Sequence, residues 1–262
     1  MLGRAVLRSA RDVLGDGAIG TSRRRPSEGP GVSFIADLTD RRTLAQLLET
    51  SRPGVVINCA GVLRGGAAAE LDRVNARLPH DLAEAADAIG VRVIHVSTDG
   101  VFSGTHGPSD ETTLPDPIDA YGRSKLAGEL TASPHLTVRT SIIGRRPDGQ
   151  GLVEWAVAQR GGTVQGHARS LWSGVTAPEL ARLLVEHVVA GDPASGIVHV
   201  QSEAVSKAEL LRRIDRAFGL GLTVDDVEEP FVDRRLVSTR RDIVLRARPL
   251  DEQLDELVSG GT

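Results

Sequence analysis

The stretch "VRVIHVSTDGVF", residues 91–102, decides the expected fold of this 262-residue chain. Its first half is an almost continuous apolar run, which is typical of a strand buried on both faces of a parallel sheet. The run ends in the hydroxyls of Ser97 and Thr98. Because ligands bind at the carboxyl ends of strands in open α/β sheets, we expect these hydroxyls at a binding site. The other interpretation is that the Thr98 hydroxyl only begins a turn.

Similar apolar runs alternate with helical patterns along the first half of the chain. The runs predict strands at 18–22, 32–36, 55–60, 91–97 and 136–143, and the patterns between them predict helices at 4–14, 41–50, 75–89 and 119–132. Asp37 or Asp40 can cap the second of these helices, and Pro79 suits the first turn of the third. The alternation predicts an α/β fold, a doubly wound parallel sheet with helices on both faces.

After about residue 144 the alternation loosens. The later patterns predict helices at 151–160, 177–190, 206–218 and 250–257, with one strand at 196–200. These elements are too few for a second full sheet, so we expect a small α+β lobe. We therefore expect a dinucleotide-binding domain over residues 1–145. Residues 146–262 are expected to form mainly a substrate lobe, with a segment at about 163–200 returning to the first domain.

Composition narrows the class of partner and the compartment. The net charge of −4 and the pI near 6.0 give no overall basic footprint, so nucleic acid is not an expected partner. A single cysteine, Cys59, permits neither an internal disulfide nor a cysteine metal cluster, and the seven histidines lack metal-ligand spacing. For that reason we expect no metal. No apolar run approaches membrane-spanning length and the start does not resemble a signal peptide, so we expect a cytoplasmic protein.

The segment "YGRSK", residues 121–125, carries the most specific chemical pattern. Tyr121 is the only tyrosine, and Lys125 is one of two lysines beside 29 arginines. In a helix the two side chains lie one turn apart on the same face. A nearby ammonium lowers the pKa of a tyrosine, and the pair can then act as a general acid and base nearer neutral pH. The alternative is a surface pair that happens to have helical spacing.

Five motifs together resemble the extended short-chain dehydrogenase/reductases, and within them the dTDP-4-dehydrorhamnose reductase-like branch that modifies nucleotide sugars. The motifs are "VVINCAG" (55–61), "VNARLPHDLAEAA" (74–86), "VIHVSTDGVFSG" (93–104), "YGRSKLAGE" (121–129) and "RTSIIG" (139–144). The resemblance implies a reductase that transfers a nicotinamide hydride to a keto group on a nucleotide-linked deoxysugar. It also implies that Thr98 polarises the carbonyl, Tyr121 donates the proton, and Lys125 holds the nicotinamide ribose and tunes the tyrosine. A homodimer is compatible with this resemblance.

The identity of the dinucleotide is argued from "GTSRRR", residues 20–25. In a doubly wound fold the end of the second strand faces the adenosine ribose, where arginine accommodates a 2′-phosphate. Ser22, Arg23 and Arg24 occupy this place, so NADP is the expected cofactor and NAD the alternative. The other interpretation is that these are solvated loop arginines. The resemblance implies further cofactor contacts from Gly3, Asp37, Leu38, Cys59, Ala60, Gly61 and Ser97.

The chain departs from the family pattern at its start. It opens at "MLGRAVL", which resembles the end of the family's glycine-rich turn with Gly3 as the last glycine, and the preceding strand is absent. We therefore expect a sheet that lacks its central strand. Either Met1 is an internal methionine of a longer protein, or the chain is a degenerate relative that binds sugar nucleotides or serves as an assembly subunit without turnover. A second departure is Gly100, where the rhamnose branch commonly has an aromatic residue, which puts the rhamnose substrate itself in question.

Overall fold

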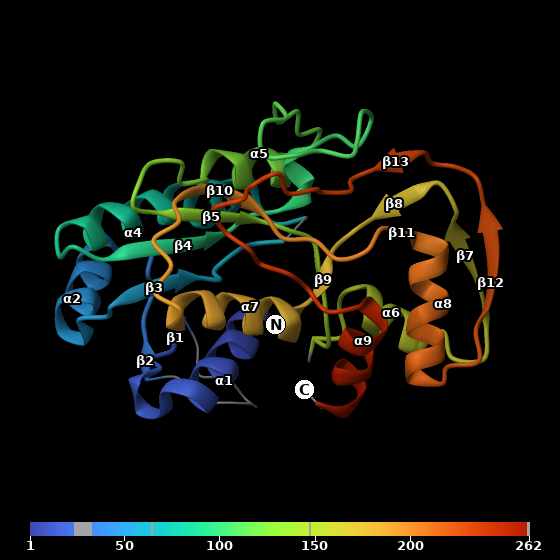
Figure 1. Ribbon diagram of the computed structural model, residues 1–262, viewed down its shortest axis with the longest axis horizontal. Helices are drawn as coiled ribbons and strands as arrows, with labels where there is room; N and C mark the ends of the chain where they lie inside the picture. The colour runs from blue at the N-terminus through green and yellow to red at the C-terminus, as the bar shows by residue number, and fades with distance from the viewer. Residues whose placement is uncertain (24–32, 64, 147, 261–262) are drawn as a thin grey trace.

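The computed structural model describes residues 1–23, 33–63, 65–146 and 148–260. Its centre is a four-stranded parallel sheet in the order β10–β5–β4–β3 (Figure 1). The strands are β3 (Val55–Asn58), β4 (Arg92–Val96), β5 (Leu136–Arg139) and β10 (Gly196–His199). The register places Ile57 opposite Ile94, and Ile94 opposite Leu136. Apolar side chains therefore form continuous rows across the sheet.

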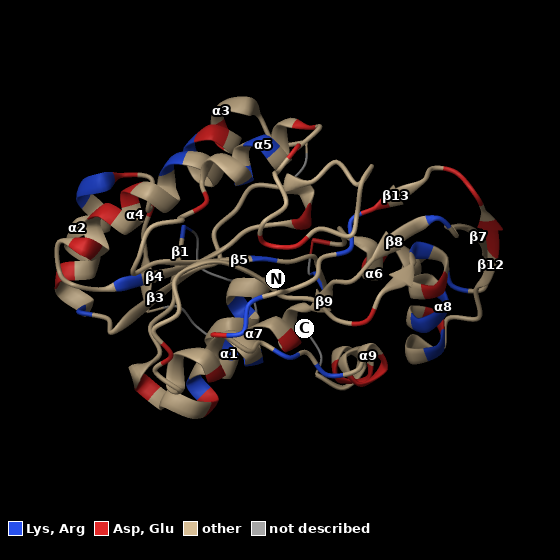
Figure 2. Cartoon of the chain, turned by 45° about the horizontal axis from the view of Figure 1, so that its top comes forward, with Lys and Arg blue, Asp and Glu red and all other residues tan. Residues whose placement is uncertain are grey.

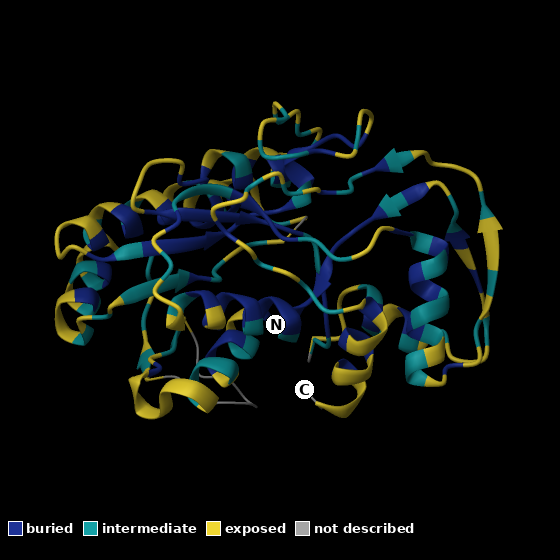
Figure 3. Cartoon of the chain, in the orientation of Figure 1, coloured by how far each residue is buried: buried dark blue, intermediate teal, exposed yellow. Residues whose placement is uncertain are grey.

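Helices cover both faces of this sheet. On one face, α1 (Leu2–Leu14) and α7 (Ala177–Val189) pack against Ile94. On the other face, α2 (Arg41–Ser51) and α4 (Leu78–Asp87) share a core with Val93. Because successive strand residues point to opposite faces, β4 is buried on both sides, as its apolar sequence requires (Figure 3). The expected doubly wound α/β fold is confirmed.

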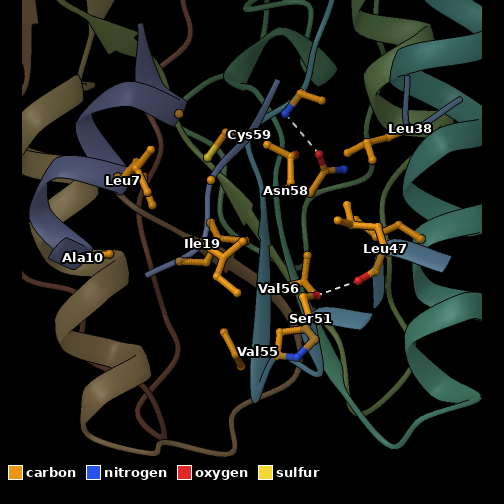
Figure 4. Close-up of a pocket in the computed structure, with 18 of the residues that line it drawn as sticks. Leu7, Ala10, Ile19, Leu38, Leu47, Ser51, Val55, Val56, Asn58 and Cys59 are labelled. Carbon is orange, nitrogen blue, oxygen red and sulfur yellow. Dashed lines mark hydrogen bonds between the residues drawn. The ribbon is translucent and has the colours of Figure 1, made fainter. Parts of the chain in front are cut away.

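The sheet is interrupted beside β3. Strands β1 (Thr21–Ser22) and β2 (Phe34–Ile35) form a separate parallel pair. Within the described residues, this pair shares no ladder with β3. A cavity of about 1470 Å³ lies between the two sheets and is lined by residues of α1, β1 and β3 (Figure 4). The interruption lies where the sequence predicted a missing central strand.

The second half of the chain builds a separate core. It brings together α6 (Leu152–Ala158), α8 (Lys207–Phe218) and α9 (Leu250–Ser259) (Figure 1). These helices contribute to a buried apolar cluster that includes Trp172. Two small sheets flank these helices: β7 (Thr163–His167) with β12 (Thr223–Val227), and β8 (Ser170–Trp172) with β11 (Val205–Ser206) and β13 (Val232–Asp233). Helix α8 carries both signs of charge, including the Arg213–Glu209 pair (Figure 2). Sequence patterns missed these strands because each has only two to five residues.

Several element boundaries differ from the sequence prediction, and one division changes the course of the chain. The run at 136–143 is divided into β5 and β6 (Ile142–Ile143) because β6 leaves the central sheet and pairs with β9 (Val175–Thr176). The Thr140 carbonyl between them accepts a hydrogen bond from the Asp99 N–H at 3.0 Å. This division brings the turn after β4 into contact with the segment that leads to the second core.

The helix predicted at 119–132 is shorter, and the helix before it begins irregularly. Helix α5 (Ala120–Ala127) ends at Gly128, which packs so closely on η2 (Leu71–Arg77) that a Cβ there would lie less than 3.0 Å from the Asn75 carbonyl oxygen. The segment η2 is a π-helical run that continues directly into α4. Helix α4 carries proline in its first turn, as expected, and Asp40 caps α2 by accepting from the Thr43 N–H at 3.2 Å.

Candidate functional site

The residues expected to contact a dinucleotide line the cavity between β1 and β3. They are Gly3, Ser22, Arg23, Asp37, Leu38, Cys59, Ala60 and Gly61. Arg24 lies outside the described residues. In Figure 4, Leu7 and Ala10 of α1 lie on one side of the cavity, and Leu38 and Leu47 lie on the other. Eight of the residues expected to contact the cofactor therefore line one cavity.

The amino end of α1 lies at the carboxyl end of β3. A Cβ added to Gly3 would lie 3.5 Å from the Cβ of Cys59, in ordinary van der Waals contact. Helix α1 begins at Leu2, so the positive end of its dipole is at the cavity. Helix amino ends in this position bind phosphate groups, which suits the pyrophosphate of a dinucleotide.

Two charged side chains stand at the β1 end of the cavity. The backbone N–H and the hydroxyl of Thr39 donate to Asp37 at 3.0 and 2.7 Å. These bonds lower the pKa of Asp37, which is therefore ionised at neutral pH. Arg23 pairs with Glu70 at 3.4 Å, and the two side chains are 54% and 36% exposed. Because exposed ion pairs are weak, Arg23 can exchange this carboxylate for a phosphate.

Cys59 is a small packing residue in this cavity rather than a nucleophile. Desolvation raises the pKa of its thiol to about 12, so the reactive thiolate does not form near neutral pH. Its neighbour Gly61 faces Asn75, whose side-chain oxygen would lie 3.6 Å from a Cβ at that position. Small residues here keep the loop after β3 close to η2.

The hydroxyls that follow β4 already have hydrogen-bond partners. Ser97 is buried and donates to Glu129 at 2.7 Å, so its hydroxyl is engaged away from the cavity lining. Thr98 caps the short helix η3 (Asp99–Val101) by accepting from the Gly100 N–H at 3.0 Å, and it donates to the Asp99 carboxylate at 3.1 Å. Thr98 therefore does begin a turn, as the second interpretation of this residue expected. A ligand carbonyl would have to replace Asp99 as the acceptor.

Helix α5 is held directly over this turn. Asp119 caps α5 by accepting from the Gly122 N–H at 2.6 Å. Gly122 lies against the turn, where a Cβ would be less than 3.0 Å from the Gly100 carbonyl oxygen. Tyr121, the neighbour of Gly122, is half-buried. The close approach therefore fixes the helix that carries Tyr121 beside the turn that begins at Thr98.

Lys125 is buried at the carboxyl end of β4, so the surface-pair interpretation is wrong for this lysine. Only 4% of the residue is exposed. Its Nζ donates to the Val96 carbonyl oxygen at 2.8 Å and lies 3.2 Å from His95 Nε2. Desolvation lowers the pKa of Lys125 to about 8, although the negative charge of Glu129 partly opposes this shift. This amine is thus bound to the carbonyl of Val96, which precedes Thr98 by two residues in the chain.

Sequence reasoning missed the polar side chains that hold Lys125 and α5 in place. His95 contacts Lys125, and its other ring nitrogen lies 3.1 Å from the Asn58 amide nitrogen. Asn75 donates to the Ser124 hydroxyl of α5 at 3.1 Å. Asn58 and His95 are directly opposite each other on β3 and β4. The available signal was therefore a polar residue at matching positions within two otherwise apolar strands.

A second buried pair lies beneath α5. Glu129 binds Arg139 through two hydrogen bonds of 2.8 and 2.7 Å, and each side chain is only 3% exposed.

Among the described residues, no group of three or more His, Cys, Asp or Glu side chains is placed to hold a metal ion. None of the described helices combines the length and the apolar character needed to cross a membrane. The polar side chains gathered around the turn after β4 carry hydroxyl, phenol, amine and imidazole groups.

Comparisons with known proteins agree with the motifs and the fold. A reductase described as probable low-salt glycan biosynthesis reductase Agl14, from Haloferax volcanii, is 32% identical over 84% of this chain and 77% of its own length. A dTDP-4-dehydrorhamnose reductase from Burkholderia thailandensis is 41% identical, over 41% of this chain and 39% of that relative. The crystal structure of a hypothetical dTDP-4-dehydrorhamnose reductase from Sulfolobus tokodaii has a TM-score of 0.75 and 27% identity, with 88% of each chain covered.

The family model agrees with these relatives over a longer stretch. The model described as the RmlD substrate binding domain matches residues 1–219, which include the interrupted sheet, the turn after β4 and helix α5. The resemblance argued from the five motifs is confirmed. This chain belongs to the RmlD substrate binding domain family.

Proposed function

We propose that this protein is an NADP-dependent reductase of a keto group on a nucleotide-linked deoxysugar. The observation that carries this proposal is the place of Lys125. Its amine donates to the carbonyl of Val96, which lies two residues before Thr98 in the chain. Lys125 itself lies one helical turn after Tyr121 on α5. The cavity lined by the eight expected dinucleotide contacts adjoins this anchor, because Asn58 and Cys59 belong to its lining. A cofactor in that cavity would lie between α1 and the reacting groups.

Each side chain has a role that its contacts support. The bound cofactor supplies the hydride that reaches the carbonyl carbon. Tyr121 gives its phenolic proton to the carbonyl oxygen as negative charge develops there. The protonated form of Lys125 would stabilise the resulting phenolate and bind a ribose hydroxyl, which its compact shape permits. The Thr98 hydroxyl turns from Asp99 to the carbonyl oxygen and orients it.

The cofactor preference follows from the groups near β1. Arg23 is exposed, lines the cavity, and can bind a 2′-phosphate in place of Glu70. Ser22 beside it offers a hydroxyl to the same phosphate. Asp37 stays ionised but lies after β2, where Thr39 occupies it. NADP is therefore the preferred dinucleotide and NAD the alternative.

We also propose that the two cores divide the work between cofactor and substrate. Residues 1–145 hold the dinucleotide, and residues 146–262 mainly bind the nucleotide sugar. Part of the second half returns to the first core, because β10 pairs with β5 and Leu180 of α7 packs with Ile94. Residues 163–172 instead contribute Val164 and Trp172 to the second core. The substrate would lie between these cores, over the turn after β4.

The test is the oxidation of NADPH with a panel of nucleotide-linked 4-keto-6-deoxysugars. We expect turnover by the wild-type protein and a loss of about 10²–10⁴-fold in kcat for Tyr121→Phe, because the proton donor is gone. NADPH affinity, measured by fluorescence titration, should be nearly unchanged in this variant. Lys125→Met should lose both activity and affinity, whereas Lys207→Met, at the only other lysine, should lose neither. Equal turnover by Tyr121→Phe and wild type would remove Tyr121 from the mechanism.

A further inference from the structure

We propose that Asn58 and His95 are positioning residues that set the charge of Lys125, an inference that rests on the proposed function. The three side chains form a buried chain of contacts from β3 through β4 to α5. Asn58 and His95 are 4% and 0% exposed. Because buried polar side chains are hydrogen-bonded, the 3.1 Å contact makes Asn58 and His95 partners of each other. Their donor and acceptor roles are linked for this reason.

The chain of contacts begins at a backbone group in the cavity lining. The Ala60 N–H donates to Asn58 Oδ1 at 3.0 Å (Figure 4). This bond turns the amide nitrogen of Asn58 toward His95 Nδ1, at 3.1 Å. An amide nitrogen only donates, so Nδ1 of a neutral imidazole must accept. The ring proton of His95 is consequently on Nε2.

That tautomer determines which protonation state of the Lys125 amine fits its contacts. Nε2 lies 3.2 Å from Nζ of Lys125, and Nζ also donates to the Val96 carbonyl at 2.8 Å. An Nε2–H group that faces an ammonium places two donors against each other, whereas a neutral amine offers a lone pair. Every polar atom in the trio is satisfied when Lys125 is neutral. The arrangement thus favours the amine over the ammonium.

Charging the amine requires a defined rearrangement. Lys125 takes one proton from solvent, while the His95 ring proton leaves Nε2 and a proton occupies Nδ1. The total gain is therefore a single proton. Nε2 can then accept from the ammonium, and Asn58 must present Oδ1 to Nδ1–H. Asn58 then loses its bond with Ala60. Because Ala60 lines the cavity, the backbone of the cofactor loop is coupled to the charge of the lysine.

The surrounding groups leave this coupling intact. Glu129 and, to a smaller extent, Cys59 oppose the lowering of the Lys125 pKa by burial. Tyr121 lies one turn before Lys125 on α5. His80 of α4 makes a smaller electrostatic contribution that also lowers the pKa of His95. The Ser97 hydroxyl and Arg139 both donate hydrogen bonds to the Glu129 carboxylate. Burial and the positive charge of Lys125 lower the pKa of His95 well below its usual value, so the imidazole stays neutral.

The test is the tautomer of His95 in free protein, read by long-range ¹H–¹⁵N NMR correlations of the imidazole rings. We expect the Nε2–H tautomer at about pH 10, where Lys125 is neutral, and the Nδ1–H tautomer at about pH 6, where it is charged. The midpoint should coincide with the titration of the Lys125 side chain, followed by its ¹³Cε shift. His95→Gln identifies the signals by removing them. A single tautomer throughout, or Nδ1–H at the higher pH, would overturn the proposal.

Asn58→Asp separates this inference from a merely structural role. A carboxylate accepts from both the Ala60 N–H and His95 Nδ1–H, so the Nδ1–H tautomer should persist at both pH values. The pKa of Lys125 should rise by about 1 unit, and the pH profile of kcat should move with it. An unchanged tautomer in Asn58→Asp would contradict the proposal. If that variant does not fold, the wild-type titration alone decides. Absent turnover with the expected tautomers would refute the proposed function and leave this inference standing.

Discussion

At the scale of single residues, Lys125 lies in a place that disfavours its charge. Lys125 is almost fully buried, and the groups that contact its amine are a backbone carbonyl and a neutral imidazole. Burial of an ammonium costs free energy unless a counter-charge compensates for it. The negative charge of Glu129 raises the pKa of Lys125, but the hydrogen bonds of this carboxylate go to Ser97 and Arg139. The site therefore gives up stability for an amine that titrates near neutral pH.

This cost predicts how stability depends on pH. Lys125 has its pKa lowered from 10.5 to about 8, so the folded state binds the proton less tightly than the unfolded state. The penalty is fully present below about pH 8 and fades as pH rises toward 10.5. Relative to Lys125→Met, the wild-type free energy of unfolding should therefore rise by about 3 kcal/mol across this window. Urea unfolding of both proteins at several pH values measures this difference, and a flat difference would contradict it.

At the scale of elements, α5 is fixed by close contacts at both ends of its short length. Gly122 lies against the Gly100 carbonyl, and Gly128 lies against the Asn75 carbonyl. Neither place leaves room for a Cβ atom, so glycine is needed for steric reasons. The same contacts set the position of Tyr121 relative to the turn at Thr98. Small residues at these contacts thus contribute to the geometry of the site.

Gly122→Ala should displace α5 from this turn. The added methyl group overlaps the Gly100 carbonyl oxygen, so we expect a loss of about 1–3 kcal/mol in stability and at least about a tenfold fall in kcat. Gly54→Ala is the matched control, since no atom lies within 4 Å of the added Cβ. Chemical unfolding and NADPH oxidation measure the two effects. The same stability and kcat in both variants would show that α5 does not need this contact.

Most elements could be predicted because their sequence signals are local. The run before Ser97 is apolar because β4 is buried on both faces, and the Asp40 cap marks the start of α2. The spacing of Tyr121 and Lys125 placed both residues on α5 correctly. The contacts of Lys125 with His95 and of His95 with Asn58 depend on the register of β3 and β4. Register is a property of the folded sheet, so periodicity alone did not reveal it.

At the scale of the whole molecule, the interruption of the sheet is the dominant feature. Among residues 1–23, 33–63, 65–146 and 148–260, β3 has a ladder partner on one side only. The cavity that separates it from β1 is lined with apolar residues such as Leu44 and Val56. The central strands β4 and β5 have partners on both sides. Backbone groups at the cavity consequently lack the protection that a neighbouring strand gives.

Hydrogen exchange should report this difference directly. Amides of β1, β2 and β3 are expected to exchange faster than those of β4 and β5, because opening the cavity edge breaks fewer contacts than opening the centre. Mass spectrometry of peptides that span Val55–Asn58 and Leu136–Arg139 measures both rates in one experiment. Equal protection of the two peptides would mean that the cavity edge is as stable as the core.

The most direct measurement for the proposed site is a crystal structure with NADP and a nucleotide-linked keto sugar. We expect the dinucleotide in the cavity beside Gly3 and Arg23, with its ribose on Lys125 Nζ. The Tyr121 hydroxyl should lie within hydrogen-bond reach, about 3 Å, of the keto oxygen. A dinucleotide bound elsewhere, or a Tyr121 hydroxyl remote from the keto oxygen, would contradict the proposed reductase mechanism.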